Sequence, residues 1–213
     1  MSDQLAVPAS AQPLLEIVPL GGLGEFGLNM MAISYADTML IVDAGSMFPE
    51  PELLGVDLII PDLTYLQQHS AQTSAVVLTH GHEDHIGALW HVMRTLKGPV
   101  YGTPLTLALA ESKLAEHDID TRDRLIGVRP RDKIVVGDFT VEFLRVTHSM
   151  PDCVAVAIHT PVGVVICTGD RTAQARAAAL SLPFAFEANR GQAADRFQFI
   201  AHGRGCAFLL APP

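Results

Sequence analysis

Four side chains of the kinds that bind metal ions stand within six residues of this chain: His80, His82, Asp84 and His85. The cluster follows residues 75–79, a β-branched run that predicts a strand, and precedes residues 86–96, whose apolar positions recur with helical spacing. Two histidines two positions apart can converge on one cation where the chain turns, and the Asp–His pair can then face a second. Gly81 leaves room for that sharp turn. A loop that is rich in histidine by chance is the alternative, and four ligand-type residues at a strand-to-helix junction make it the weaker interpretation.

Two more residues could supply the imidazole and the bridging carboxylate that this cluster lacks. His148 follows a predicted strand at residues 141–146, and Asp170 follows another at residues 164–167. Taken alone, each would more simply be a capping or hydrogen-bonding residue. Together with the cluster, both lie just past strand ends, where loops gather at one edge of a sheet. We therefore count both among the candidate ligands.

Asp43 also follows a predicted strand, at residues 39–42. Its carboxylate could accept a hydrogen bond from the far ring nitrogen of a ligand histidine and so orient the ring. An aspartate that caps the turn before Gly45 explains the residue equally well. Both interpretations stay open.

The rest of the sequence alternates strands with helices. Apolar runs predict further strands at 14–19, 29–35, 100–101, 125–128, 133–136, 139–146 and 154–158, and helices at 62–69, 86–96 and 104–116. Strands dominate both halves, which favours two sheets with helices outside them over one doubly wound sheet. We expect a flexible leader at 1–13, one α/β domain at 14–170, and an atypical tail at 171–213, where twelve of 43 residues are Ala and the strand pattern is lost.

The glycines at 22, 24 and 27, with Asp43 some twenty residues on, imitate a dinucleotide-binding fingerprint. The context does not fit, because the 15 residues between Gly27 and Asp43 read as a hairpin. They leave no room for the crossover helix and second strand that the fingerprint requires. We therefore set the nucleotide interpretation aside.

Charge, cysteine content and hydropathy exclude several classes of protein. The net charge is −9, and residues 1–170 hold nine basic against 21 acidic residues, which argues against a broad basic face for nucleic acid. Three cysteines without CxxC spacing indicate reduced thiols and a cytoplasmic location. No apolar run reaches the roughly 18 residues of a membrane span, and the start does not read as a secretory signal.

At this point the sequence resembles a known family. Residues 79–87 resemble the metal-binding signature of the metallo-β-lactamase superfamily, which is specific to the superfamily and not to a substrate. Five segments are similar to the ribonuclease J family within it: residues 20–30, 41–45, 48–62, 147–152 and 168–170. The likeness covers about residues 14–170.

The resemblance implies an αββα sandwich and a two-zinc site in an enzyme that degrades and processes RNA. By motif, one zinc would be held by His80, His82 and His148, and the second by Asp84 and His85, with Asp170 bridging the two. A hydroxide between the metals would attack the phosphorus in line. Asp84 and His85 are the catalytic candidates, with Asp84 as the natural proton acceptor. Manganese or magnesium could take the place of zinc.

The departures from the family are equally informative. Its members are far longer, with an inserted domain that grips RNA, a further histidine ligand and a C-terminal domain, none of which is identifiable here. The text from Arg171 onward does not resemble the family and suggests a truncated or frame-shifted reading. We therefore expect an incomplete αββα sandwich that binds RNA weakly if at all, without membrane contact and with homo-oligomerisation left open. The alternatives are a stand-alone zinc hydrolase acting on a thioester, lactone or β-lactam, and a non-catalytic remnant.

Overall fold

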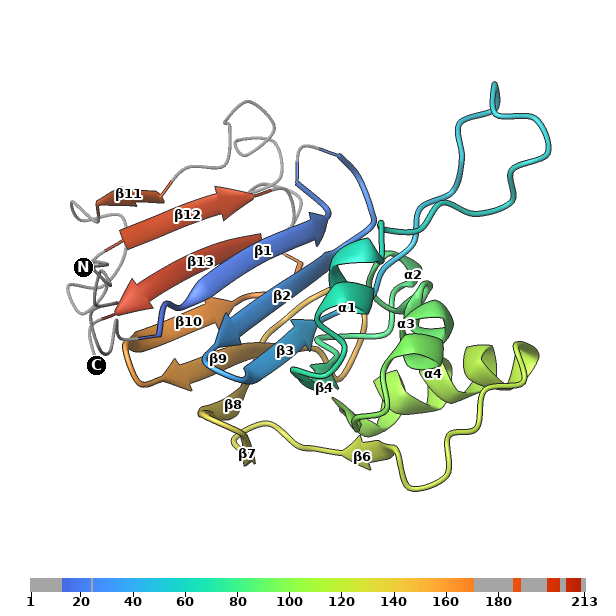
Figure 1. Ribbon diagram of the computed structural model, residues 1–213. Helices are drawn as coiled ribbons and strands as arrows, with labels where there is room; N and C mark the ends of the chain where they lie inside the picture. The colour runs from blue at the N-terminus through green and yellow to red at the C-terminus, as the bar shows by residue number, and fades with distance from the viewer. Residues whose placement is uncertain (1–12, 24, 171–185, 189–198, 204–205, 212–213) are drawn as a thin grey trace, which may run out of the picture.

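The computed structural model describes residues 13–23 and 25–170, together with the backbone of 186–188, 199–203 and 206–211. Its strands form two sheets (Figure 1). The first sheet contains, in spatial order, β1 (Glu16–Gly21), β2 (Met30–Tyr35), β3 (Thr38–Val42), β4 (Thr73–Val77), β5 (Val100–Gly102) and β6 (Leu125–Gly127). The second contains β11 (Phe186–Ala188), β12 (Phe199–Gly203), β13 (Cys206–Ala211), β10 (Gly163–Cys167), β9 (Val154–Thr160), β8 (Phe139–Arg145) and β7 (Lys133–Val136).

The two-residue period of the strands sorts their side chains into two cores. On β2, Met31 and Ile33 face the second sheet and join a cluster that includes Phe139 and Phe143 of β8. Met30 of the same strand faces the opposite way, into the cluster beneath the helices. Both phenylalanines are fully buried, and each such side chain contributes about 1.5–3 kcal/mol of transfer free energy. The packing of the two sheets therefore rests on strands whose inward positions are almost all apolar.

Four helices lie beside the first sheet: α1 (Thr64–Gln68), α2 (Glu83–Ile86), α3 (Leu89–Thr95) and α4 (Pro104–Glu116). Their buried residues Leu66, Leu89 and Leu114 pack into the second core together with Ile41 of β3. The described residues thus form a helix layer and two sheet layers, and none of them forms a helix on the other face of the second sheet. The expected αββα sandwich, in its incomplete form, agrees with this arrangement. None of the described helices has the length and hydrophobicity needed to cross a membrane.

One predicted helix is interrupted. Residues 86–96 were expected to be a single helix, but α2 ends at Ile86 and α3 begins at Leu89. The N–H group of Ala88 donates to the carbonyl of Ala44 (2.8 Å) and not to the carbonyl four residues before it. A tertiary hydrogen bond therefore replaces one hydrogen bond of the helix. Helix α4, by contrast, has the predicted limits of 104 and 116.

The expected loss of strand pattern after Asp170 is wrong for three segments. Strand β13 pairs with β10 in antiparallel register, with Val164 opposite Ala211, and β12 and β11 extend the sheet beyond it. The runs at 199–203 and 206–211 contain enough apolar residues to pair as strands despite the alanine-rich composition around them. Residues 1–12 of the predicted leader at 1–13 and the remainder of the tail lie outside the described residues, so the proposed division of the chain stays a prediction.

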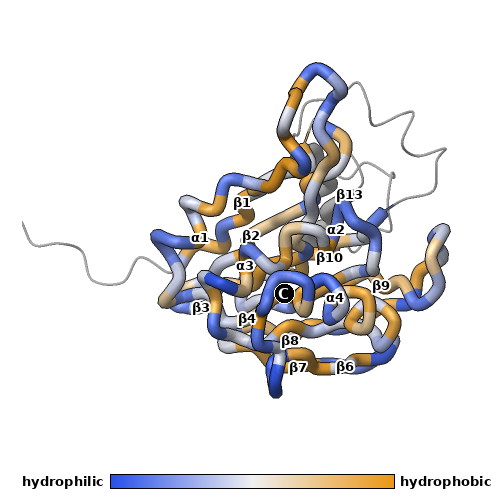
Figure 2. The backbone as a smooth tube through the Cα atoms, turned by 90° about the vertical axis from the view of Figure 1, so that its right-hand side faces the viewer, coloured by the Kyte–Doolittle hydropathy of each residue, from blue (hydrophilic) through white to orange (hydrophobic). Residues whose placement is uncertain are grey.

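The segment between β3 and α1 projects from the body as a long loop (Figures 1 and 2). Two backbone hydrogen bonds between Met47 and Ile59 close its base, and its tip leaves Leu54 91% exposed. Below the base, the N–H groups of Ala44 and Ser46 donate to the carbonyls of His85 and Glu83. Backbone hydrogen bonds thus join the start of the loop to α2, which carries two of the candidate ligands.

Candidate metal centre

The six candidate ligands meet where three strands end. His80 and His82 follow β4, His148 follows β8, and Asp170 follows β10, while Asp84 and His85 lie on α2. They form two groups, in each of which the ligand atoms all lie within 4.8 Å of one another: His80, His82, His148 and Asp170, and Asp84, His85 and Asp170. Asp170 belongs to both groups. The structure thus brings together every candidate ligand that the sequence predicted.

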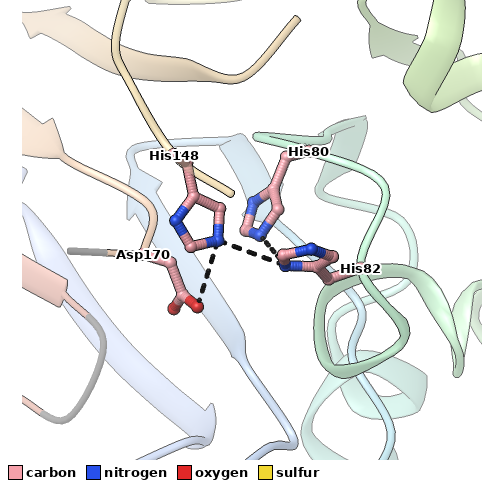
Figure 3. Close-up of side chains that lie close together, drawn as sticks. All are labelled: His80, His82, His148 and Asp170. Atoms are coloured by element: carbon pink, nitrogen blue, oxygen red, sulfur yellow. Dashed lines mark hydrogen bonds and ion pairs between the residues drawn. The ribbon is translucent and has the colours of Figure 1, made fainter. Parts of the chain in front are cut away.

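In the first group, three imidazoles converge from two loops (Figure 3). His82 Nδ1 lies 2.9 Å from His80 Nε2 and 3.2 Å from His148 Nε2. His148 Nε2 also lies 3.5 Å from Asp170 Oδ2. The ring nitrogens and the carboxylate therefore point into one small volume.

The second group contains more oxygen than nitrogen. His85 Nε2 lies 3.3 Å from Asp170 Oδ1 and 3.7 Å from Asp84 Oδ2. Because Oδ1 of Asp170 faces this group and Oδ2 faces the first, one carboxylate can serve both. That is the arrangement required of a bridging ligand.

Gly81 lets the histidine loop pass close to neighbouring side chains. A Cβ atom at this position would lie 2.6 Å from Leu109 Cδ1 and 3.3 Å from Met150 Sδ. The loop therefore passes between α4 and the segment that carries His148. A side chain at residue 81 would require the side chains of Leu109 and Met150 to shift.

Asp43 binds the two rings that are most deeply buried, one directly and one through a neighbour. Its Oδ2 atom lies 2.7 Å from His85 Nδ1, and its carboxylate also accepts from the N–H and the hydroxyl of Thr79, each at 2.8 Å. Thr79 Oγ1 lies 3.0 Å from His80 Nδ1. Since the hydroxyl donates to Asp43, it can accept from His80, which leaves Nε2 of both histidines free to face the site. Of the two open interpretations of Asp43, the contacts favour the one in which it orients a ligand histidine.

The two buried histidines have opposite pKa shifts. Burial, reinforced by the charges of His85 and His82, lowers the pKa of His80 to about 2, so its ring is neutral at physiological pH. Burial also acts to lower the pKa of His85, but the charge of Asp43 and hydrogen bonds to Asp170 and Asp43 outweigh it and raise that pKa to about 10. The carboxylates of Asp43 and Asp170, one beside each ring nitrogen of His85, therefore stabilise positive charge on that ring.

The donor set fits divalent metal ions. Three imidazoles and a carboxylate are ligands of the type that zinc accepts, and the second group adds another carboxylate, which manganese and magnesium also accept. Asp170 and Asp84 lie 3.3 and 3.7 Å from Nε2 of His85, so negative charge surrounds the point where the second cation would lie. The imidazole nitrogens of His80 and His82 lie 2.9 Å apart, so both rings are directed toward the same point.

Two residues at the site were not anticipated from the sequence. Thr79 was placed at the end of a strand, and its contacts with Asp43 become visible only when β3 and β4 are paired. Asn29 was placed in a predicted strand, and its side chain contacts both Asp84 and His85. The glycines before Asn29 were the available signal, because such a dense group marks a close approach of backbone segments.

Comparison with known proteins identifies the family. Residues 23–197 match the metallo-beta-lactamase superfamily. The chain is 42% identical to Ribonuclease J 1 of Streptococcus pyogenes, over 72% of this chain and 28% of that protein. It is 45% identical to Ribonuclease J of Helicobacter pylori, over 73% of this chain and 23% of that protein. The chain thus spans about a quarter of the length of these curated relatives.

Solved structures share the fold at lower identity. The metallo-beta-lactamase fold protein YhfI from Bacillus subtilis superposes with a TM-score of 0.56 at 20% identity, over 79% of this chain and 67% of that one. A protein of unknown function from Enterococcus faecalis gives the same TM-score at 24% identity, over 73% of this chain and 43% of that one. With its two packed sheets and its histidine and aspartate cluster at the strand ends, this chain belongs to the metallo-β-lactamase superfamily.

Proposed function

We propose that the chain carries the metal centre of a ribonuclease J-like hydrolase, which cleaves RNA phosphodiesters with two divalent cations, zinc in the first instance. The observation that carries the proposal is the pair of ligand groups that share Asp170. The 40–45% identity to proteins named ribonuclease J directs it toward RNA. The buried thiol of Cys153, which forms no disulfide, supports a reducing compartment such as the cytoplasm.

Each residue has a defined task in this proposal. His80, His82 and His148 hold one cation, Asp84 and His85 hold the other, and Asp170 binds both. Cations held there activate water and stabilise charge on the phosphoryl oxygens. Asp43 fixes the ring of His85 through a hydrogen bond to Nδ1.

Asp84 is the proton acceptor in the proposed reaction. Its side chain is 21% exposed, compared with 6% for Asp43 and 3% for Asp170. Water therefore reaches this carboxylate more readily than the other two. A carboxylate that is both accessible and adjacent to the reacting group suits general base catalysis.

Charge limits what this chain can do to RNA by itself. Affinity for RNA depends on phosphate contacts with Lys and Arg, and residues 1–170 hold nine basic against 21 acidic residues. Two divalent cations offset only about four of these twelve excess negative charges. We therefore expect slow cleavage and weak binding that falls further as salt concentration rises, because poor positioning of the substrate can cost several kcal/mol of catalysis.

The test compares two substrates on one preparation. The chain, loaded with zinc or manganese, is incubated with 5′-labelled single-stranded RNA and, in parallel, with a chromogenic β-lactam. Slow RNA cleavage that disappears in His82→Ala supports the proposal. Turnover of the β-lactam alone would support the stand-alone hydrolase, which the acidic composition also favours. RNA cleavage as fast as that of an intact ribonuclease J assayed alongside would contradict the predicted weakness, and loss of all metal on gel filtration would contradict the metal centre.

A further inference from the structure

Asn29 lies at the entrance to β2 and is joined to Asp84 by three hydrogen bonds. Its backbone N–H donates to the Asp84 carbonyl at 3.0 Å. Its side-chain nitrogen donates to the same carbonyl at 3.0 Å and to Asp84 Oδ2 at 3.2 Å. The nitrogen also lies 3.1 Å from His85 Nε2. A single amide group thus contacts both residues assigned to the second cation.

We propose that Asn29 is a positioning residue for the second cation, because it fixes Asp84, whose carboxylate lies beside His85, in the orientation that binds it. This inference rests on the proposed function, in which that pair holds a metal ion. Asn29 is not itself the ligand in this arrangement. Its nitrogen, which has no lone pair available for a metal, faces the site, and the opposite amide orientation would lose both bonds to Asp84.

An amide is suited to this position because its nitrogen carries two hydrogens. One can donate to the carbonyl of Asp84 and the other to its carboxylate, so the side chain and the backbone of one ligand residue are held by the same group. The carbonyl has lost its helical partner, since the N–H of Ala88 donates to Ala44. Asn29 therefore replaces the hydrogen bond that the break between α2 and α3 removes.

The glycines around Asn29 make its approach possible. Gly22 has a φ of +81°, and a Cβ atom there would lie 2.8 Å from Asn29 Oδ1. A Cβ atom at Gly45 would collide with the Asp84 carbonyl and lie 2.8 Å from the backbone nitrogen of Asn29. The glycine-rich segment that imitates a nucleotide fingerprint therefore has a different use here, which is to let three backbone segments meet.

The backbone leading into Asn29 is strained. Gly27 has a φ of +94° and Leu28 a φ of +58°, a region that residues with a branched side chain rarely adopt. Such conformations persist when the surrounding contacts impose them, and they concentrate at functional sites. The carbonyl of Asn29 accepts from Gly45, which anchors the residue from its other side.

The experiment measures the two metal affinities separately. The EDTA-treated chain and its Asn29→Leu variant are titrated with Co²⁺, and the visible absorption is followed for each equivalent bound. Leucine keeps the approximate shape of the side chain and removes its donor. We expect the first equivalent to bind as in the unaltered chain and the second about 10- to 100-fold more weakly, as for other groups that orient metal ligands.

Two further variants make the result specific. Asn29→Ala removes the same donor with less volume, so agreement between the two variants separates the hydrogen bonds from packing, and it serves if the leucine variant does not fold. Thr38→Val removes another partly buried hydrogen bond, that to Asp138 at 3.0 Å, and should lower stability without changing either affinity.

Each outcome decides between the claims. Unchanged binding of the second equivalent, or equal weakening of both, would overturn the role of Asn29 and leave the proposed function standing. Fewer than two equivalents bound by the unaltered chain would overturn the two-cation site itself, and the role of Asn29 with it.

Discussion

Replacement of Asp43 by Asn should weaken both metal sites, and the second more than the first. Asparagine fits the backbone, because it tolerates the left-handed conformation that Asp43 adopts with a φ of +60°. The carboxylate accepts from three donors, namely the N–H of Thr79, its hydroxyl and His85 Nδ1. An amide offers only one oxygen. At least one donor must then face the amide nitrogen.

The expected magnitude follows from these contacts. A hydrogen bond to a charged group contributes about 1.5–3 kcal/mol, which corresponds to roughly a 10- to 150-fold change in affinity. If His85 accepts from the new amide through Nδ1, its proton moves to Nε2, the nitrogen that faces the cation. His80 is affected less, since it contacts Asp43 only through Thr79.

Competition between the proton and the metal ion for His85 acts in the opposite direction. In the metal-free chain, Asp43 is the leading charge that raises the pKa of His85, so its removal reduces competition from the proton. The proton brings one positive charge, whereas a divalent cation brings two. Loss of the Asp43 charge therefore costs the metal-bound form more than the protonated form, and the net effect is weaker binding.

Isothermal titration with Zn²⁺ at constant pH measures both affinities. Asp138→Asn is the matched control, because it makes the same change of charge at an exposed residue whose side chain bonds to Thr38. The reasoning would be refuted if Asp43→Asn bound both cations as tightly as the unaltered chain, or if the control weakened them equally.

Two further predictions concern the ligands and the effect of pH. His82→Ala and Asp84→Ala should each abolish hydrolysis. His117→Ala should retain both metal ions but lose about 0.5–1.5 kcal/mol of stability, because it removes the stacking of His117 on Trp90 (3.7 Å between ring centroids). Equal losses of activity in all three variants would show that the cluster is not the active centre. The contribution of the two buried histidines to the stability of the metal-free chain should be greatest near pH 6.5. The raised pKa of His85 contributes stability that is present below 6.5 and is lost as pH rises through about 10, and the lowered pKa of His80 contributes stability that is present above 6.5 and is lost as pH falls toward about 2. Urea unfolding of EDTA-treated protein between pH 5 and 9 measures this, and stability that rises steadily from pH 6.5 to 9 would contradict it.

The parts of the structure that could be predicted are those set by local sequence. Helix α4 begins at Pro104, which suits the first turn of a helix, and continues through residues of high helix propensity. The alternation of apolar with polar or small residues along β2 indicated the hairpin that β2 and β3 form, and the two-sheet arrangement is confirmed. The ligand cluster could be predicted for the same reason, since four of its six members lie within six residues of the sequence.

The contacts that could not be predicted join residues far apart in the chain. Asn29 and Asp84 are 55 positions apart, and Asp43 and Thr79 are 36 apart. The break between α2 and α3 has the same origin, because it depends on a hydrogen bond from Ala88 to Ala44. Neither periodicity nor composition reports such pairings, which arise only when the first sheet places β2, β3 and β4 side by side.

Thr79 connects the parts of the site that come from the two sheets. Its N–H and hydroxyl donate to Asp43 in the first sheet, and its carbonyl accepts from Val154, the first residue of β9 in the second sheet, at 3.0 Å. Strand β9 pairs with both β8 and β10, the strands that precede His148 and Asp170. Thr79 and β9 therefore help to set the position of these two ligands relative to the histidine loop. Residues 1–170, which contain twelve more acidic than basic residues, are unsuited by their charge to holding a polyanion. The residues that position the metal ligands here, Asp43, Thr79 and Val154, include no Lys or Arg. Metal binding in this chain should therefore withstand salt concentrations that abolish any contact with RNA phosphates.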